Sequence, residues 1–509
     1  MGIGDTGISS SYKRPTFIGK LVYAAGAVGA GSQRLGCLCV GMKTAAGSMV
    51  ADQDIVRVTN EDEVDAYAGV GSQLARMAYK ALKVDGAEVY IAAVTEPGAG
   101  TQATATMVLT GALTTGGTLR FRIAGETVVV SVGVTDTLDT IGAAIAAAFN
   151  AKTRLPVTAG YNAGTDTVTL TCRNKGTQGK DWILYWDTTN GAETVTGLVI
   201  TMTGSAAVNT QGVRLGAAAS GTGSEDVTTL LTKLVTKRYA RIAVGHNDAT
   251  NAALWETQLN TLMGPLAMLY EMFIIGHNGT KAAAQTLAQT TMNAFLGELV
   301  WQRNGESHPS ELAAYFAAKR SVTEQASPVP DYDNLPLPYI APQAFDADIP
   351  TDTEQDQVLN TGVTPVTTVN GEARIVRAIT SYCLNGSDPD ERCLDIGDAV
   401  FPQYAMLDLK LMYETDFRPA NPYVGPNPAP EEETPLEGVG YPDLWNSLVS
   451  ARAEEWYANR WLEERPIGVW APRSGFNKPG RYIVDEIPLA VRRVQHRLDQ
   501  VVRQVFNAT

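Results

Sequence analysis

Residues 69–111 read GVGSQLARMAYKALKVDGAEVYIAAVTEPGAGTQATATMVLTG, and this stretch indicates the architecture of the chain. Apolar side chains recur in its first part at spacings that place them on one face of a helix: Leu74, Met77, Ala78 and Leu82. Gly86 ends this helix, and the apolar run at 88–94 is typical of a buried strand. A helix followed by a buried strand is half of a β–α–β unit. After residue 97 a Thr-rich alternation begins, which predicts that the α/β domain is interrupted.

The α/β pattern returns near residue 224. Expected helices cover 224–235, 249–262, 280–290 and 309–320, and expected strands cover 239–244, 268–276 and 294–301. Upstream, a first strand is expected at 37–42, and Asn60 is the predicted N-cap of a short helix over 61–68. Strands that alternate with helices predict a mostly parallel sheet that is covered on both faces.

Residues 101–210 are expected to form a β-rich module inserted into this domain. Its strand candidates are separated by glycine turns at 116–117 and 125, and Thr and Val dominate the strands. One helix lies among them, with Asp136 as its predicted N-cap. Four apolar residues define the buried side of that helix: Leu138, Ile141, Ile145 and Phe149.

The last domain is expected to begin near Phe345. A proline-rich stretch at 327–342 precedes it, and its prolines are expected to exclude both helix and sheet pairing. Asn370-Gly371 predicts a hairpin between two alternating runs. The pattern over 442–464 predicts a helix that begins at a proline.

These patterns predict a multidomain α/β protein in which a β-rich domain interrupts the core and an α+β domain follows it. The expected ranges are 1–20 for an N-terminal arm, 21–100 with 211–345 for the discontinuous core, 101–210 for the inserted domain, 346–480 for the C-terminal domain and 481–509 for a C-terminal arm.

The composition excludes several classes of protein. A chain of 509 residues is long enough for about three domains. Its net charge of −14 argues against a surface for nucleic acid or for an anionic membrane, because both need basic patches. Neither a membrane-spanning run nor a signal peptide is expected, so the chain is predicted to fold in a cytosol.

The two ends of the chain differ from the rest. Residues 8–20 carry Tyr12, Phe17 and Ile18 but cannot form a core, so they are expected either to fray or to order on a neighbouring subunit. Residues 473–509 hold seven basic and three acidic residues, a net charge of +4 on an acidic chain. Opposite charge favours docking of this tail on another part of an assembly.

No catalytic, cofactor-binding or metal-binding site is predicted. The histidines lack the spacing of metal ligands: His246, His277, His308 and His496. His246 and His277 follow expected strands, where α/β enzymes place catalytic groups, so an enzyme remains an alternative. The cysteines are too sparse for a disulfide scaffold: Cys37, Cys39, Cys172, Cys383 and Cys393.

Three sets of segments resemble contractile bacteriophage tail sheath proteins of the Mu-like myovirus type. The first is GVGSQLARMAYKAL at 69–82 with AEVYIAAV at 87–94, GGTLRFRIAGETVVV at 116–130 and LPVTAGYNAGTDTVTLTCRNKGTQGKDW at 155–182. The second is GEARIVRAITSY at 371–382 with DERCLDIGD at 390–398, and the third is GRYIVDEIPLAVRRVQHRL at 480–498.

The resemblance implies a structural subunit that polymerises around a tail tube, as helical strands or stacked rings, and contracts to drive the tube through a host envelope. The implied partners are further copies of the chain and the tube, baseplate and tail terminator proteins, with no cofactor and no nucleic acid. The C-terminal domain would lie innermost and the inserted domain outermost. The implied location is the virion tail, after a period in the host cytoplasm.

Contacts between subunits are predicted at the two termini, through Tyr12, Phe17, Ile18, Tyr482, Ile483, Val484, Ile487, Arg492, Arg493 and Arg497. A disulfide between Cys383 and Cys393, or across subunits, is a hypothesis beside the simpler one of reduced thiols. The rival classes are a non-contractile tube or surface-layer subunit and an α/β enzyme.

Overall fold

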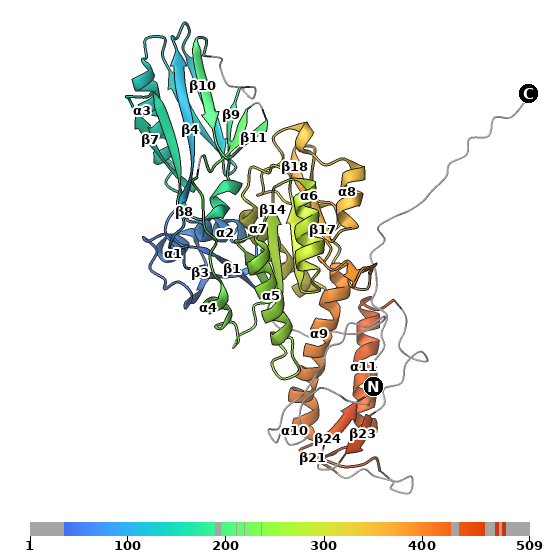
Figure 1. Ribbon diagram of the computed structural model, residues 1–509. Coiled ribbons are helices and arrows are strands. Elements are labelled where there is room, and N and C mark those ends of the chain that lie inside the picture. The colour runs from blue at the N-terminus through green and yellow to red at the C-terminus, as the bar shows by residue number, and fades with distance from the viewer. Residues whose placement is uncertain are drawn as a thin grey trace, which may run out of the picture.

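The computed structural model describes residues 35–463, apart from 189–194, 210, 218, 236 and 429–436, together with the backbone of 474–477 and 481–484. Figure 1 shows three parts along one axis: a β-rich module at the top, an α/β core in the middle and a helical extension at the bottom. Each part contains one of the larger hydrophobic clusters of the described residues.

The core is built on a nine-stranded sheet in the order β16-β18-β17-β15-β14-β13-β1-β3-β2. Its strands are β1 (Gly36–Met42), β2 (Ile55–Val58), β3 (Glu88–Val94), β13 (Arg241–Val244), β14 (Met272–His277), β15 (Gly297–Trp301), β16 (Leu335–Pro336), β17 (Val363–Val369) and β18 (Glu372–Ile375). The pairs from β3 to β17 are parallel, as the sequence predicts, and antiparallel pairs lie at both ends. Every residue of β1 is buried, which explains its apolar sequence.

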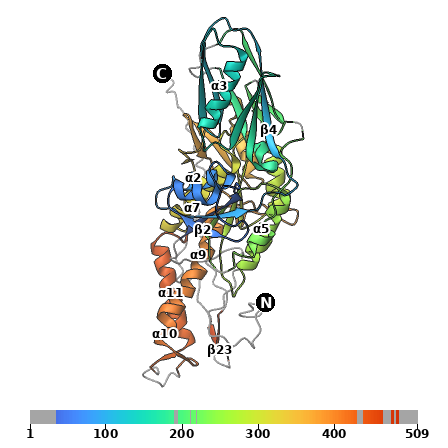
Figure 2. The same ribbon diagram turned by 90° about the vertical axis from the view of Figure 1, so that its left-hand side faces the viewer.

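Helices cover both faces of this sheet. On one face α2 (Gln73–Ala81) packs against α7 (Pro309–Ala326), while α5 (Ala249–Leu262) lies on the opposite face (Figure 2). The second face also holds α6 (Lys281–Gln285) and the π-helical turn η2 (Thr286–Met292), which packs against α5. Before α1 (Glu61–Ala68), the Asn60 side chain accepts a hydrogen bond from the Glu63 N–H, which confirms the predicted N-cap.

The helix predicted at 224–235 is wrong in most of its length, because only α4 (Thr228–Leu231) forms. The Asp226 carboxylate accepts hydrogen bonds from both the N–H and the hydroxyl of Thr228. Beyond α4 the N–H of Lys233 donates to the carbonyl of Leu230, a tighter turn than an α-helix makes. Local side-chain bonds of this kind compete with helix formation.

The β-rich module consists of two sheets that enclose an apolar core of their own. One sheet has the order β10-β4-β8-β7 and the other β11-β12-β9-β5-β6. The elements are β4 (Gln102–Gly111), β5 (Gly117–Ile123), β6 (Glu126–Val132), α3 (Leu138–Ala151), β7 (Val157–Asn162), β8 (Thr167–Lys175), the 3-10 turn η1 (Thr177–Asp181), β9 (Ile183–Asp187), β10 (Leu198–Thr203), β11 (Ala206–Asn209) and β12 (Gly212–Arg214). The chain enters and leaves the module side by side, because Thr101 and Thr222 form an antiparallel bridge.

The predicted N-cap of the module helix is wrong by one residue. Thr137 caps α3, and its hydroxyl accepts from the Thr140 N–H at 3.3 Å. Asp136 instead accepts a hydrogen bond from the Gly133 N–H at 2.6 Å and so closes the turn before the helix.

The core sheet extends beyond residue 345, where the sequence predicts the core to end. β17 pairs in parallel with β15, so residues 363–375 complete the core sheet. The predicted hairpin at Asn370-Gly371 is confirmed between β17 and β18, with φ values of 53° and 76°.

The proline-rich stretch at 327–342 also belongs to the core, contrary to the expectation that its prolines exclude pairing. Leu335-Pro336 forms the edge strand β16 against β18, and Leu337 and Ile340 are buried in the core. An edge strand pairs on one side only, so the N–H that proline lacks is not needed there.

The helical extension is formed by α9 (Ile396–Met412) and α11 (Pro442–Ala458), which lie side by side below the core (Figures 1 and 2). The predicted helix at 442–464 starts at the expected proline and ends earlier than expected. The remaining elements are η3 (Asp346–Asp348), α8 (Asp352–Leu359), β19 (Leu384–Asn385), β20 (Asp388–Pro389), the π-helical turn η4 (Tyr413–Phe417), α10 (Arg418–Ala420), β21 (Tyr423–Val424), β22 (Val439–Gly440), β23 (Ser474–Asn477) and β24 (Arg481–Val484).

Candidate functional site at the junction of core and module

The carboxyl edge of the parallel strands is the candidate site, because open α/β sheets bind ligands there, where the strand order reverses. In this sheet β1 lies between β3 and β13, so the order reverses at β1. Polar residues follow the neighbouring strands: His246 comes after β13, Asn278 after β14 and Asn304 after β15. The β-rich module sits on this edge (Figure 1).

Gln73 fills the point of reversal. Its amide oxygen accepts from the Met42 N–H at 3.1 Å, and its amide nitrogen donates to the Gly245 carbonyl at 2.7 Å. Asn174 of the module closes over it, because the Asn174 side-chain oxygen accepts from the Gln73 N–H at 2.8 Å. The cavity that remains beside Gln73 measures about 10 Å³, the size of a single water site.

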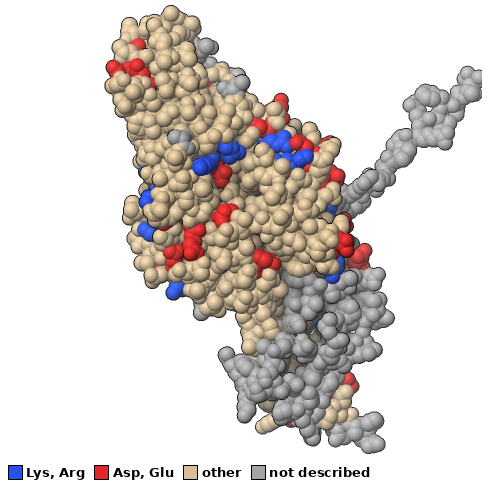
Figure 3. Space-filling model, in the orientation of Figure 1, with Lys and Arg blue, Asp and Glu red and all other residues tan. Residues whose placement is uncertain are grey.

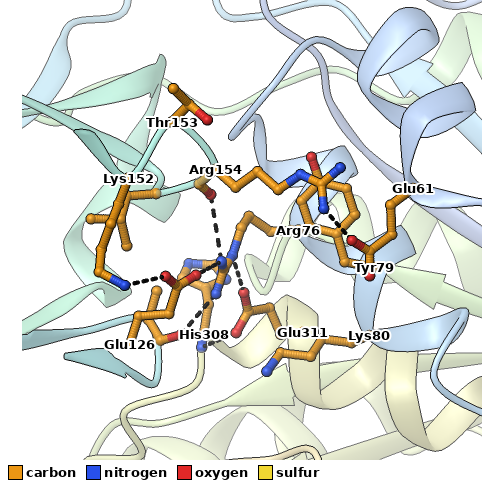
Figure 4. Close-up of polar contacts among 12 residues, drawn as sticks. Glu61, Arg76, Tyr79, Lys80, Glu126, Lys152, Thr153, Arg154, His308 and Glu311 are labelled. Carbon is orange, nitrogen blue, oxygen red and sulfur yellow. Dashed lines mark hydrogen bonds and ion pairs between the residues drawn. The ribbon is translucent and has the colours of Figure 1, made fainter. Parts of the chain in front are cut away.

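A buried guanidinium joins the module to the core (Figure 4). Arg76 of α2 donates to Glu311 of α7 at 2.5 Å, to the Glu126 carboxylate of the module at 2.9 Å and to the Ala124 carbonyl at 2.7 Å. Burial opposes the charge of Arg76, but Glu311 and Glu126 outweigh it and raise its pKa. The arginine is therefore a permanent cation that three segments share.

A second arginine reaches from the module to helix α1. Arg154 bonds the Asp65 carboxylate at 2.8 Å and also pairs with Glu61. Its guanidinium lies over the ring of Tyr79, 5.0 Å from the centroid (Figure 4), and the Tyr79 hydroxyl donates to Asp65. These contacts hold the loop before β7 against the core.

A third set of contacts lies beyond the ends of β14 and β15. Arg214 of β12 donates to the side chain and carbonyl of Asn278 at 2.8 and 2.7 Å and to Asn304 at 3.0 Å. Arg122 of β5 pairs with Glu306 of the core at 3.1 Å. In Figure 3 Lys and Arg side chains gather where the module meets the core, whereas most of the module's face is uncharged.

Two histidines of the described part of the chain, His246 and His308, bond to neighbouring core groups. His246 is buried, and its Nε2 accepts from the Trp255 indole N–H at 2.8 Å. His308 lies before α7, where its Nδ1 accepts from the Ser310 N–H, and burial lowers its pKa. Burial also lowers the pKa of His277 at the end of β14. His496 lies outside the described residues.

The described residues contain neither a metal-binding cluster nor a membrane-spanning helix. No group of three or more His, Cys, Asp or Glu side chains is placed to hold a metal ion. Of the helices in the same part of the chain, none is long and apolar enough to span a membrane.

Of the predicted contact residues, the backbone of Tyr482, Ile483 and Val484 is described. They form β24, which pairs antiparallel with β23. The others lie outside the described residues: Tyr12, Phe17, Ile18, Ile487, Arg492, Arg493 and Arg497.

The hypothesis of a disulfide between Cys383 and Cys393 is wrong within one chain, because the structure has both as thiols. Both are buried, Cys383 beside Asn293 and Cys393 next to Thr380, whose hydroxyl donates to the Cys393 carbonyl. Burial also raises the pKa of Cys383. A disulfide across subunits stays a prediction.

The arginines at the junction were not found from the sequence. One sequence feature could have indicated a buried arginine: Arg76 lies between Ala75 and Met77, inside an apolar helical stretch. Its partner Glu311 is 235 positions away, and no local pattern joins the two.

The chain is similar to a known protein over most of its length. The chain is 27% identical over 362 residues, 70% of each chain, to the Mu-like prophage FluMu tail sheath protein of Haemophilus influenzae. The chain is similar to a phage tail sheath protein. The resemblance predicted from the sequence is thereby confirmed. No family model matches the chain.

Solved structures of sheath proteins align with most of the chain, at low identity and low TM-scores. The sheath tail protein of Desulfitobacterium hafniense aligns with 95% of this chain and 100% of its own, at 12% identity and a TM-score of 0.45. The sheath tail protein of Listeria innocua aligns with 90% and 96%, at 11% identity and a TM-score of 0.44. The contracted sheath of an extracellular contractile injection system aligns with 98% and 99%, at 11% identity and a TM-score of 0.45.

Proposed function

We propose that this chain is the structural subunit of a contractile tail sheath, which polymerises around a tail tube and contracts to drive it through a host envelope. The observation that carries the proposal is the similarity to a Mu-like tail sheath protein over 70% of both chains. The proposed partners are further copies of the chain and the tube, baseplate and tail terminator proteins. The proposed location is the tail of a phage-like particle, with host cytoplasm before assembly.

The junction supports a structural role over the enzyme alternative. An α/β enzyme would need an open carboxyl edge beside His246 or His277. Here Gln73, Asn174 and three arginines fill that edge with contacts between the chain's own parts. We therefore propose that the chain is not an enzyme.

The proposed arrangement has four units. The core comprises 35–100 and 223–395, the inserted module 101–222 faces outward, and the extension from 396 faces the tube. The terminal arms join neighbouring subunits: the N-terminal arm is 1–20, and the C-terminal arm is shortened from 481–509 to 485–509 because 481–484 pair with β23. This division follows the module's own hydrophobic cluster, the Thr101–Thr222 bridge and the start of α9, and it moves the end of the core from 345 to 395 because β17 and β18 pair in the core sheet.

Electron microscopy of the purified full-length chain tests the proposal. Hollow cylinders are expected, in long or short forms. If the folded chain stays monomeric at all concentrations, even when a tube protein is supplied, a sheath role is contradicted. Turnover of a small substrate would instead favour the enzyme class.

A further inference from the structure

Helix α9 belongs to two hydrophobic clusters. Its first turns carry Ile396, Ala399 and Val400 into the core cluster. From Phe401 onward its apolar residues join a separate cluster with α11: Phe401, Ala405, Leu409 and Met412. The boundary between the two clusters therefore falls inside one helix, between residues 400 and 401.

A proline stands at this boundary. Pro402 is inside α9, where it cannot donate the helical hydrogen bond to the carbonyl four residues earlier. Interior prolines are the usual cause of bends in helices. The helix is thus weakest at the point where its packing changes from one cluster to the other.

Below this point α9 and α11 form one unit. The Trp456 indole N–H donates to the Asp408 carboxylate at 3.1 Å, and Arg452 lies 3.4 Å from the same oxygen. Trp445 and Val449 of α11 are buried against α9 in the shared cluster. A movement at Pro402 would carry both helices together.

A small apolar contact, which we call the latch, holds this unit against the core, beside the packing of Val329 on the cluster of α9 and α11. It consists of Met268, Tyr270 and Leu407, which form a hydrophobic cluster of their own. The Tyr270 hydroxyl is buried, and no described residue is its hydrogen-bond partner. Met268 has a φ of 49°, in the left-handed region that side chains disfavour. Both features weaken the closed latch.

We infer that α9 bends at Pro402. Its lower half moves together with α11 when the latch of Met268, Tyr270 and Leu407 opens. The inference rests on the proposed function, because a swinging extension lets a sheath subunit turn its core while the extension keeps its own contacts. The chain then has a closed state, seen here, and an open state that both latch costs favour.

Distances between two spin labels on the full-length chain in solution test the hinge. The labels are placed on introduced cysteines at exposed positions, Thr257→Cys on α5 and Glu455→Cys on α11. The five native cysteines are buried and do not compete for the label. A closed distance is expected in the unmodified background, and a second, open distance is expected to gain population when the latch is weakened.

Four variants test the latch and Pro402 separately. Leu407→Ala removes a latch contact and is expected to raise the open fraction about tenfold, whereas Leu407→Met keeps the volume and is expected to match the parent. Tyr270→Phe removes the buried hydroxyl and is expected to lower the open fraction at least about fivefold. Pro402→Ala restores the helical bond and is expected to abolish the open distance, even with Leu407→Ala.

The matched control is Pro442→Ala, at the first position of α11, where proline breaks no helical bond. It is expected to change nothing. If every variant shows a single distance between the spin labels while circular dichroism shows a folded chain, the hinge is overturned. An open distance that persists in Pro402→Ala would also overturn it. Cylinder formation is measured separately. Cylinders together with a single distance between the labels overturn the hinge alone. Two distances between the labels without cylinders overturn the sheath role alone.

Discussion

Arg76 is the residue through which module and core depend on each other. Arg76→Met is expected to destabilise the full-length chain by about 3–5 kcal/mol, because it leaves Glu311 buried without its cation. Unfolding in denaturant measures the loss. The matched control is Arg57→Met, which breaks an exposed pair with Glu88 and is expected to cost less than about 1 kcal/mol.

A double variant sharpens this prediction. Arg76→Met with Glu311→Leu replaces the buried pair by apolar groups and is expected to recover most of the lost stability. Equal losses in the single and double variants would mean that Arg76 acts through the module's Glu126 and Ala124 alone.

Glu271 makes the stability of the core depend on pH. Burial raises its pKa to about 8, against hydrogen bonding from the Tyr239 N–H and the charges of Arg238 and Arg241, which lower it. The folded chain therefore keeps the proton up to about pH 8, whereas the unfolded chain loses it near pH 4.3. Because the folded state binds more protons in that interval, this group lowers stability as the pH rises through it.

Glu271→Gln removes this effect, since its amide oxygen can still accept from the Tyr239 N–H. The variant's advantage over the parent in free energy of unfolding is expected to grow between pH 4 and pH 8 and to stay constant above. The control has the opposite sign: Thr228 lowers the pKa of Asp226, so Asp226→Asn is expected to cost most at neutral pH and least near pH 2. An advantage of Glu271→Gln that does not change with pH would contradict the assignment.

At the scale of elements, the inserted module is expected to be removable. Thr101 and Thr222 exchange N–H···O bonds of 3.1 and 3.3 Å, so the two connections already lie side by side. Deleting 101–222 and joining Gly100 to Gly223 is expected to leave a core that unfolds cooperatively, with lower stability because the carboxyl edge is uncovered. Scanning calorimetry of the deletion measures this.

A deletion that moves the junction into the module, from 111 to 197, is the control. It leaves β4 beside β10 but removes β8, the other partner of β4, and is expected to give insoluble protein. If the deletion of 101–222 is equally insoluble, the module is part of the core's own fold.

The sequence predicts those elements that a local pattern encodes, and it does not predict contacts between distant positions. Buried runs such as the one in β1 and short signals such as Asn370-Gly371 lie within a few residues, so they predict strands and turns correctly. The pairing of β17 with β15 and the Arg76–Glu311 contact join distant positions, and no local pattern encodes them. The helix expected at 224–235 forms only in part, because Asp226 bonds Thr228 before α4 and a tighter turn at Lys233 follows it.

At the scale of the whole molecule, the terminal arms are predicted to join subunits. Removing 1–20 and 485–509 is expected to leave the temperature of unfolding almost unchanged and to abolish cylinders, since β24 and the described core are kept. Electron microscopy and calorimetry measure the two effects. The charge contribution is isolated by Arg492→Gln, Arg493→Gln and Arg497→Gln in the full chain, which is expected to weaken assembly more at low salt than at high salt.

The truncated chain also distinguishes the alternatives. Normal cylinders from it would remove the arms from the lattice contacts. Failure to fold would mean that the arms belong to the chain's own core.

The side-by-side ends of the module have a consequence for synthesis on the ribosome. All strands of the module lie between residues 102 and 214, whereas the core sheet is complete only when β18 has been made at residue 375. At about 5–20 residues per second, the module is finished roughly 8–30 s earlier. For much of that time β1 and β3 lack α7 (Pro309–Ala326), which packs on both strands in the finished core. Nascent chains of this protein are thus most exposed to aggregation after the module has folded, and slower translation lengthens that period.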